Sequence, residues 1–406
     1  MVWRTSGAYD SMRDMRRRAF LGLIGAAAGA RLWSADNAAR LRVGVIGHTG
    51  RGNYGHGLDT MWLLIPETEI VAVADADAAG LAAAKNRLKI SQGFADYRQM
   101  LEVVRPDIVV VGPRHVDQHR DMLMAAIGAG AKGIYVEKPF CRSPEEADQI
   151  LGACDKANVK LAVAHRNRYH PALPTVKRLI QEGAIGQLLE FRGRGKEDDR
   201  GGSEDLWVLG SHVINAAHFL GGDPVGCSAW IEQGGHPITR ADVKDGKEGL
   251  GPLAGDTVHV RYDMAGGIPF YFDSVRRGGN KGATFGLQVV GNAGTIFLRM
   301  DKDPIAQLLK GNPFLPDADL RAWVPVTSAG PGIPEPVEGM PKVAENHVLA
   351  GRDLVAAIRE NRKPLCDGRE GATTVEMICA AFESHRLGGS RVAFPLKTRA
   401  NPLTLL

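Results

Sequence analysis

Residues 41–62 read LRVGVIGHTGRGNYGHGLDTMW and combine an apolar run, a glycine-rich turn and a helix-like segment. The apolar run at residues 43–46 is typical of a strand that is buried on both faces. The segment from Leu58 to Trp62 has the apolar spacing of a helix. The order predicts a strand–turn–helix unit.

The turn of this unit predicts an anion site. Its free N–H groups and the positive end of the helix dipole point at whatever occupies the turn, typically a pyrophosphate. Thr49 stands where the second glycine of the usual fingerprint is found, so an ordinary strand-to-helix turn remains the alternative. The candidate cofactor-binding residues in this turn are Gly47, Thr49, Gly50, Arg51 and Gly52.

A second expected strand, Glu69 to Ala74, delivers Asp75 at its end. An acid in this position is placed to accept hydrogen bonds from an adenosine ribose. Residues 76–79 include no Arg or Lys that could neutralise a 2′-phosphate. We therefore predict NAD as the cofactor, in preference to NADP.

Strands and helices alternate up to residue 165. Strands are expected at 107–111, 133–136 and 160–164, and helices at 78–88, 96–104, 117–128 and from Pro144, which Ser143 caps. This alternation predicts a doubly wound parallel sheet, whose ligands lie beyond the carboxyl ends of the strands. The residues expected at that edge are Asp75, Pro113, Lys138 and His165.

The pattern changes after Pro171. A helix at 172–182 precedes strand-like runs at 188–192, 225–231, 257–262, 269–275, 286–290 and 294–298, and helices are expected at 346–361 and 372–386. We predict an open, mostly antiparallel sheet with one face packed on helices. The fold class is therefore α/β, with a dinucleotide-binding domain at 41–165 and a substrate and oligomerisation domain at 166–406.

The composition is ordinary for a globular chain: 44% of its 406 residues are hydrophobic and 24% are charged. The net charge of +4 gives no indication of nucleic-acid binding. The five cysteines form no Cys-x-x-Cys pair, and the twelve histidines have no convincing ligand spacing, so neither a disulfide framework nor a metal site is predicted.

Residues 1–40 are interpreted as a signal peptide and linker. Three arginines at 16–18 precede Phe20 and an apolar, Ala/Gly-rich run at 21–30, which is typical of a twin-arginine signal and too short for a stable membrane span. A basic tail is the alternative. A twin-arginine signal implies the twin-arginine export machinery as a partner and a periplasmic or otherwise exported location. The folded enzyme would then load NAD before export and retain it.

The tripeptide Glu137-Lys138-Pro139 stands at the end of the fourth expected strand. A lysine beside a dinucleotide site can hydrogen-bond a substrate hydroxyl and the nicotinamide ribose, and it favours the alkoxide that forms as hydride leaves carbon. The alternative is a surface ion pair between Lys138 and Glu137.

From Leu41 onward, the chain resembles the glucose–fructose oxidoreductase/inositol dehydrogenase (Gfo/Idh/MocA) family. The family implies a Rossmann domain, an α/β domain whose open sheet often mediates oligomerisation, NAD(P), and a sugar or polyol substrate. A homodimer or homotetramer is the corresponding expectation. The motifs that carry the resemblance are Val45-Ile46-Gly47, Val73-Ala74-Asp75, Glu137-Lys138-Pro139-Phe140, Arg168-Tyr169-His170-Pro171, Gly183-Ala184-Ile185-Gly186, Gly210-Ser211-His212 and Pro364-Leu365-Cys366-Asp367-Gly368.

The resemblance assigns roles to particular residues. Lys138 matches the family's catalytic lysine, and His212 matches the histidine that takes the hydroxyl proton as a neutral imidazole. A histidine satisfied at a helix start is the alternative for His212. Asn215 would orient His212 from the same helical face. The resemblance adds His119 to the candidate cofactor-binding residues. The position of the strand ends adds Pro113, Glu137 and His165 to the same set.

One departure from the family concerns the acid that often stands four residues before this histidine, where the chain has Val208. Acids in the glycine-rich stretch 193–206 are weak substitutes for it. Trp207 either stacks on a sugar face or packs in the core. Arg168 and Tyr169 resemble the family's residues on the substrate side.

The predicted function is an exported NAD(P)-dependent oxidoreductase that acts on a hydroxyl of a sugar, polyol or glycoside, with its cofactor tightly bound. The alternative is an NAD-dependent glycoside hydrolase or lyase, in which transient oxidation at C3 permits elimination of the glycosidic bond. A non-catalytic sugar-binding protein is the third reading. The particular sugar and carbon are left open.

Overall fold

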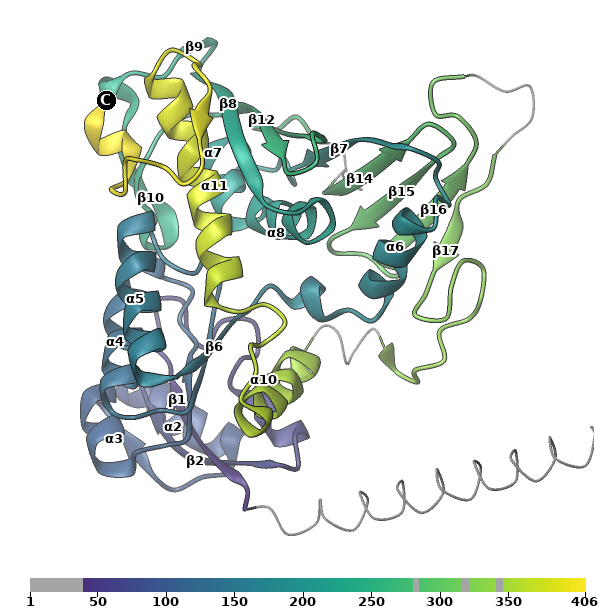
Figure 1. The fold of residues 1–406 in the computed structure, drawn as a ribbon. Helices are drawn as coiled ribbons and strands as arrows, with labels where there is room; N and C mark the ends of the chain where they lie inside the picture. Colours follow the sequence, from purple (N-terminus) through teal and green to yellow (C-terminus); the bar gives the residue numbers. More distant parts are fainter. Residues whose placement is uncertain (1–38, 280–284, 316–320, 341–345) are drawn as a thin grey trace, which may run out of the picture. The chain divides into compact units, whose positions relative to one another are not determined.

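The computed structural model describes residues 39–279, 285–315, 321–340 and 346–406 (Figure 1). Residues 41–406 form one unit by their contacts. The predicted twin-arginine signal lies outside the described residues.

The first sheet has six parallel strands in the order β3-β2-β1-β4-β5-β6. The order reverses between β1 and β4, and this is where open α/β sheets place their ligand crevice. The predicted parallel sheet is confirmed, with the two-residue β3 as an addition. The strands are β1 (Leu41–Ile46), β2 (Thr68–Ala74), β3 (Gly93–Phe94), β4 (Ile108–Val111), β5 (Gly133–Val136) and β6 (Lys160–Val163).

Three of the described helices around this sheet begin at residues whose side chains cap them. Asp77 accepts a hydrogen bond from the N–H of Gly80, and Ser143 accepts one from the N–H of Glu146. α4 and α5 lie together on one side of the sheet, and α10 lies on the other (Figure 1). These helices are α2 (Ala78–Leu88), α3 (Tyr97–Val104), α4 (His119–Gly128), α5 (Pro144–Ala157) and α10 (Val348–Glu360), with short 3-10 turns η2 (Val116–Gln118) and η3 (Arg166–Tyr169).

The segment after β1 differs from the prediction. It is a series of turns that ends in the five-residue 3-10 helix η1 (Thr60–Leu64), so the expected helix N-terminus is not formed. Gly52, Gly55 and Gly57 have φ angles of +88°, +61° and +84°, which interrupt a right-handed helix. A Cβ on Gly52 would lie 2.2 Å from the backbone N of Arg114. The glycines therefore pack the turn against its neighbours.

The second sheet is mixed and mostly antiparallel, in the order β17-β16-β15-β14-β7-β13-β12-β8-β18, with β9 on β8. Within this second sheet, β7 and β13 are the only described strands that pair in parallel. This confirms the predicted open sheet. The strands are β7 (Leu188–Arg194), β8 (Pro224–Gln233), β9 (His236–Pro237), β12 (Thr257–Met264), β13 (Pro269–Val275), β14 (Gly286–Gly291), β15 (Gly294–Arg299), β16 (Ala306–Lys310), β17 (Val324–Val326) and β18 (Val392–Ala393), beside a hairpin of β10 (Lys244–Gly246) and β11 (Gly251–Leu253).

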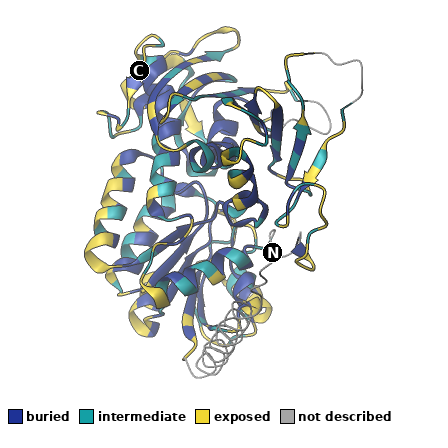
Figure 2. Cartoon of the chain, turned by 45° about the vertical axis from the view of Figure 1, so that its right-hand side comes forward, coloured by how far each residue is buried: buried dark blue, intermediate teal, exposed yellow. Residues whose placement is uncertain are grey.

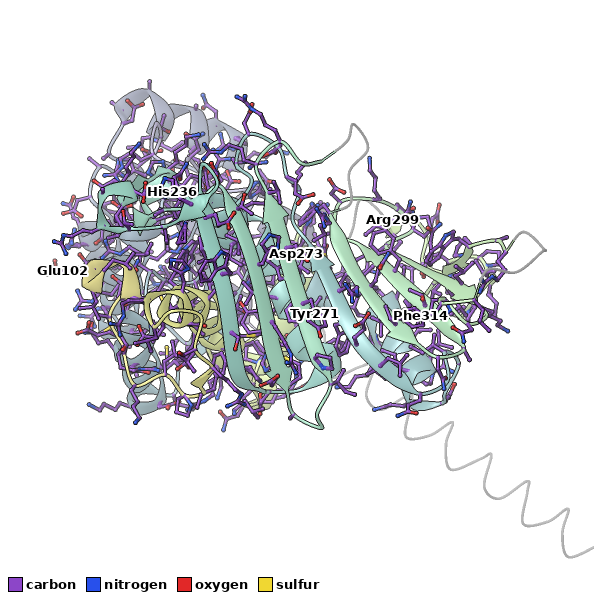
Figure 3. All side chains as sticks on the ribbon, turned by 90° about the horizontal axis from the view of Figure 1, so that it is seen from above. Glu102, His236, Tyr271, Asp273, Arg299 and Phe314 are labelled. Atoms are coloured by element: carbon purple, nitrogen blue, oxygen red, sulfur yellow. The ribbon has the colours of Figure 1, made fainter. Side chains whose placement is uncertain are left out.

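One face of this sheet packs on helices and the other does not. Burial alternates along β12 and β13, as the period of a strand requires (Figure 2). Figure 3 shows Tyr271 and Asp273 on the face away from the helices. The helices of this half are α6 (Ala172–Gln181), α7 (Ser203–Val208), α8 (Gly210–Gly221) and α11 (Gly368–Arg386).

The last helices join the two sheets. α11 contacts β8 and α8 of the second sheet's layer and also α5 and β6 of the first. α10 returns the chain to β5 and β6. None of the helices within the described ranges is long and apolar enough to cross a membrane.

The close packing of the glycine-rich turn can be tested with Gly55→Ala. A Cβ at Gly55 would lie 2.4 Å from Oε2 of Glu137 and 2.7 Å from the carbonyl oxygen of Gly112, in a left-handed conformation. We expect a loss of about 1–3 kcal/mol in the free energy of unfolding, measured by urea titration. The control Gly152→Ala, in open space on α5, should stabilise by about 0.5–1 kcal/mol. Equal stabilities of the two variants would contradict the packing.

Candidate active site

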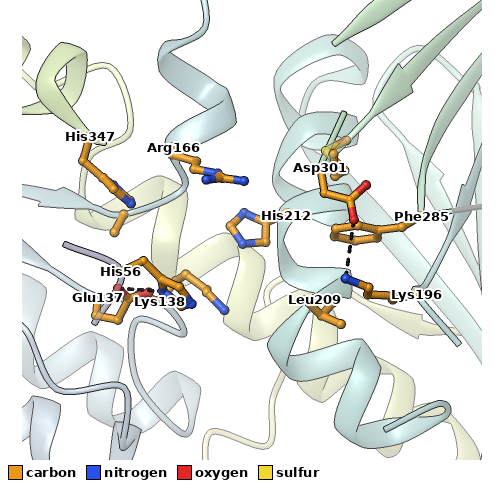
Figure 4. Close-up of a pocket in the computed structure, with 12 residues that line it drawn as sticks. His56, Glu137, Lys138, Arg166, Lys196, Leu209, His212, Phe285, Asp301 and His347 are labelled. Atoms are coloured by element: carbon orange, nitrogen blue, oxygen red, sulfur yellow. Dashed lines mark hydrogen bonds and ion pairs between the residues drawn. The ribbon is translucent and has the colours of Figure 1, made fainter. Parts of the chain in front are cut away.

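A cavity of about 180 Å³ opens beyond the carboxyl ends of β5 and β6 (Figure 4). It collects side chains from the glycine-rich turn, the ends of β5 and β6, the loop after β7, the start of α8 and the start of α10. The lining residues are His56, Glu137, Lys138, Ala164, Arg166, Lys196, Leu209, His212, Phe285, Met300, Asp301 and His347. The structure therefore brings together three of the predicted residues, Glu137, Lys138 and His212.

The ammonium group of Lys138 is held by a backbone carbonyl. Its Nζ donates to the carbonyl oxygen of Val208 at 2.9 Å, and the residue is only 6% exposed. Burial lowers the pKa of Lys138, while the charge of Glu137 acts in the opposite direction. Val208 occupies the position at which the sequence lacks the expected acid, so the main chain supplies an acceptor there.

Two neutral imidazoles stand beside this ammonium. The rings of His165 and His212 pack edge to face with centroids 5.4 Å apart. Burial, and then the charge of Lys138, lower the pKa of His165 to about 3 and that of His212 well below its ordinary value. Their Nδ1 atoms are buried without a hydrogen-bond partner among the described residues. A neutral ring with a free nitrogen can accept a proton.

Five further polar residues line the cavity and were not identified from the sequence: His56, Arg166, Lys196, Asp301 and His347. Nδ1 of His56 lies 3.4 Å from Oε2 of Glu137, which is 1% exposed. Burial alone would raise the pKa of Glu137, but His56, Lys138 and His347 outweigh it and lower that pKa to about 2. Nδ1 of His347 hydrogen-bonds the Tyr135 hydroxyl at 2.7 Å. For His56, its place inside the glycine-rich turn is a sequence signal that could have identified it; the other four have no comparable local signal.

The two halves of the chain match two family models. Residues 41–165 match the model described as oxidoreductase family, NAD-binding Rossmann fold, and residues 177–394 match the C-terminal alpha/beta domain of the same family. The chain belongs to the Gfo/Idh/MocA oxidoreductase family.

Relatives include levoglucosan dehydrogenase of Pseudarthrobacter phenanthrenivorans, which is 28% identical over 73% of this chain and 82% of its own length. Inositol 2-dehydrogenase of Rubrobacter xylanophilus is 26% identical over 63% of this chain and 71% of its own length. The solved structure of levoglucosan dehydrogenase with NADH and levoglucosan has a similar fold, with a TM-score of 0.69 and 23% identity over 88% of this chain and 100% of that one.

In this Gfo/Idh/MocA chain, the carboxylate of Asp75 is occupied by the protein itself. It accepts hydrogen bonds from the N–H of Thr49 at 3.1 Å, the hydroxyl of Thr49 at 2.7 Å, the hydroxyl of Tyr54 at 2.8 Å and the N–H of Asp77 at 3.0 Å. These bonds lower the pKa of Asp75 although burial opposes them. A carboxylate has about four acceptor sites, so a ribose would have to displace one of these donors. The ribose contact predicted for Asp75 stays a prediction.

The rest of the NAD-binding turn leaves room for a nucleotide at Gly50, where a Cβ would meet nothing within 4 Å. Arg51 reaches Asp117 at 2.6 Å, and the N–H of Gly50 donates to the side chain of Asn53. Tyr54 lies against Gly47, since a Cβ there would be 2.1 Å from its ring. Of these groups, only the open space at Gly50 fits a nucleotide as it stands, whereas the N–H of Gly50 and the carboxylate of Asp75 are already bonded within the protein.

His119 and Pro113, which were both predicted on the cofactor side, bond each other. Nε2 of His119 lies 2.7 Å from the carbonyl oxygen of Pro113, and Nδ1 lies 2.9 Å from that of Pro139. The buried ring joins the turn after β4 to the turn after β5. These two contacts engage both ring nitrogens of His119.

The four residues predicted on the substrate side do not line this cavity. Arg168 lies over the ring of Phe219 and pairs with Glu370 at 3.3 Å. Asn215 donates to Thr374 at 3.2 Å rather than to His212. The other two are buried as well: the hydroxyl of Tyr169 accepts from the N–H of Cys366, and Trp207 packs in the core. The turn of η3 directs Arg166, two residues before Arg168, into the cavity instead.

No group of three or more His, Cys, Asp or Glu side chains in the described part of the chain is arranged to hold a metal ion. The histidines around the cavity are instead spread over separate walls, with Lys138 and Arg166 between them (Figure 4).

Stability should depend on the buried neutral histidines at mildly acid pH. The pKa of His165 falls from 6.5 to about 3 on folding, so the unfolded chain binds the proton first as the pH drops below 6.5. The free energy of unfolding should then decrease by up to about 1.4 kcal/mol per pH unit for this group. In urea titrations between pH 6 and pH 5, the free energy of unfolding of His165→Gln should fall by about 1 kcal/mol less than that of the wild type.

The matched control is His236→Gln, at an exposed position on β9. This variant should show the same loss between pH 6 and pH 5 as the wild type. If His165→Gln also shows the wild-type loss, the ring of His165 is not held neutral by the fold.

Proposed function

We propose that this protein oxidises a hydroxyl group of a sugar, polyol or glycoside, with NAD as the hydride acceptor. The observation that carries the proposal is the convergence of the Lys138 ammonium and the neutral His212 ring on one cavity at the carboxyl edge of the parallel sheet. Relatives named for their action on levoglucosan, apiose and inositol support the substrate class.

Bound NAD supplies the site that receives the hydride. The chain's own groups handle the hydroxyl. Lys138 donates a hydrogen bond to the hydroxyl oxygen and stabilises the negative charge that develops there. The unprotonated His212 ring accepts the hydroxyl proton. The carbonyl of Val208 fixes the direction of the ammonium, which is the orienting task that an acid at this position would perform.

Glu137 has a positioning task in this mechanism. It accepts from the backbone N–H of Lys138 at 3.2 Å and lies beside Gly55 of the glycine-rich turn. Burial lowers the pKa of Lys138, and the negative charge of Glu137 opposes this lowering. The same carboxylate therefore links the turn after β1 to the group that contacts the substrate.

The role of Lys138 can be tested by Lys138→Met, which keeps an unbranched side chain of nearly the same length and removes the charge. We expect the rate of NADH formation to fall by about 10²–10⁴-fold in single-turnover absorbance measurements. The control Lys156→Met changes an exposed lysine on α5 and should keep the wild-type rate. An effect below about threefold at Lys138 would remove it from the mechanism.

The same assay separates oxidation from glycosidic cleavage. Free sugars that yield a keto product with NADH support the proposal. Release of the aglycone from an aryl glycoside without net NADH would assign the protein to the alternative, in which the oxidation is transient.

We also propose that the protein is exported through its twin-arginine segment with NAD already bound. The basic residues at 16–18 and the short apolar run after them support this proposal. A cofactor that leaves the cytoplasm with the enzyme has to stay bound, because free NAD would not replace it.

Nucleotide content tests this second proposal. Denatured protein from the periplasm should release about one NAD or NADH per chain, measured by chromatography. The double variant Arg17→Lys/Arg18→Lys should stay in the cytoplasm and carry the same amount. Exported protein without nucleotide would contradict retention, and unchanged export of the double variant would contradict the signal.

A further inference from the structure

The guanidinium group of Arg166 has no partner among the residues that the structure describes. It lies at the start of η3 and lines the cavity, half-buried. Among the described residues, no ion pair, hydrogen bond or aromatic ring engages it. The other two cations of the cavity differ, because Lys138 bonds the carbonyl of Val208 and Lys196 pairs with Asp301 at 3.4 Å.

The surroundings of Arg166 are rich in donors and cations. Nε2 of His347 is buried without a partner. Figure 4 shows the Arg166 side chain extending toward the ring of His212, with His347 on its other side. After burial, the charge of Arg166 contributes to the low pKa of both histidines. The two carboxylates that line the cavity already have basic partners: Glu137 lies next to His56, and Asp301 lies next to Lys196.

A substrate that fills this cavity buries Arg166 further. An unpaired guanidinium loses its hydration on burial and gains nothing in return, whereas an anion would compensate for that loss. The planar fork of an arginine matches a carboxylate with two parallel hydrogen bonds. The cavity, at about 180 Å³, is below the roughly 300–1,000 Å³ of sites for drug-sized ligands, which favours a single small sugar unit.

We propose that the substrate carries a carboxylate, and that Arg166 binds it while Lys138 and His212 act on a hydroxyl of the same molecule. This inference rests on the proposed function and names its substrate class, the sugar acids. The phosphates of NAD are not the partner of Arg166, because the pyrophosphate crevice lies between β1 and β4, whereas Arg166 follows β6 at the far side of Lys138.

The test compares binding of a sugar acid and a neutral sugar of the same size by isothermal titration calorimetry of the NAD-loaded protein. The probes are D-glucuronate, D-galacturonate, D-glucose and glucose 6-phosphate. We expect at least one uronate to bind the wild type about tenfold or more tightly than glucose. Arg166→Gln should weaken uronate binding by about 10–100-fold and leave glucose binding unchanged. Arg166→Lys should restore part of the affinity.

The control Arg178→Gln changes an arginine on the exposed face of α6, outside the cavity, and should bind as the wild type does. Equal affinity of the wild type for all uronates and glucose would overturn the inference, and this comparison requires no variant to fold. So would equal weakening of uronate and glucose by Arg166→Gln. Tighter binding of glucose 6-phosphate than of either uronate would overturn the assignment to a carboxylate.

Binding and turnover separate this inference from the proposed function. If a uronate binds through Arg166 but yields no NADH, the inference stands and the proposed oxidation fails. If glucose is oxidised as efficiently as the uronates and binds as tightly, the oxidation stands and the role of Arg166 fails.

Discussion

The site depends on one buried cation, the ammonium group of Lys138. An ammonium inside a protein is stable only where acceptors replace its water, and here the carbonyl of Val208 and the charge of Glu137 do so. Burial first, and then the field of this charge, lower the pKa of the nearby rings of His165 and His212. The cation and the proton acceptors are therefore consequences of the same burial.

The glycine-rich turn is fastened at both of its ends by carboxylates. Asp75 binds Thr49 and Tyr54 at the nucleotide end, and Glu137 lies against Gly55 at the substrate end. Positive φ angles at the glycines allow this approach, because a side chain there would collide with its neighbours. The glycine-rich turn and Lys138, which we propose hold the cofactor and contact the substrate, are thus joined through Glu137.

Much of the architecture could be predicted from residue patterns. Asp96 and Ser143 cap helices that begin where their hydrogen bonds require, and the apolar run at 108–111 is typical of a buried strand. The helix expected from Leu58 to Trp62 failed because its apolar spacing is local, whereas the turns before it are imposed by contacts with Arg114 and Glu137. Among the residues that line the cavity, the sequence analysis named Lys138 and His212. It did not name Arg166 or His347.

The sequence by itself determined the alternation of strands and helices, the caps, and the lysine at the end of β5, because these depend on residues close together in the chain. Only the tertiary structure decided which side chains share the cavity. Arg166 and Arg168 are two residues apart, yet one faces the cavity and the other pairs with Glu370 of α11. The directions of these two side chains depend on how a short turn packs against a helix two hundred residues later. Such long-range contacts produce no periodic pattern in the local sequence.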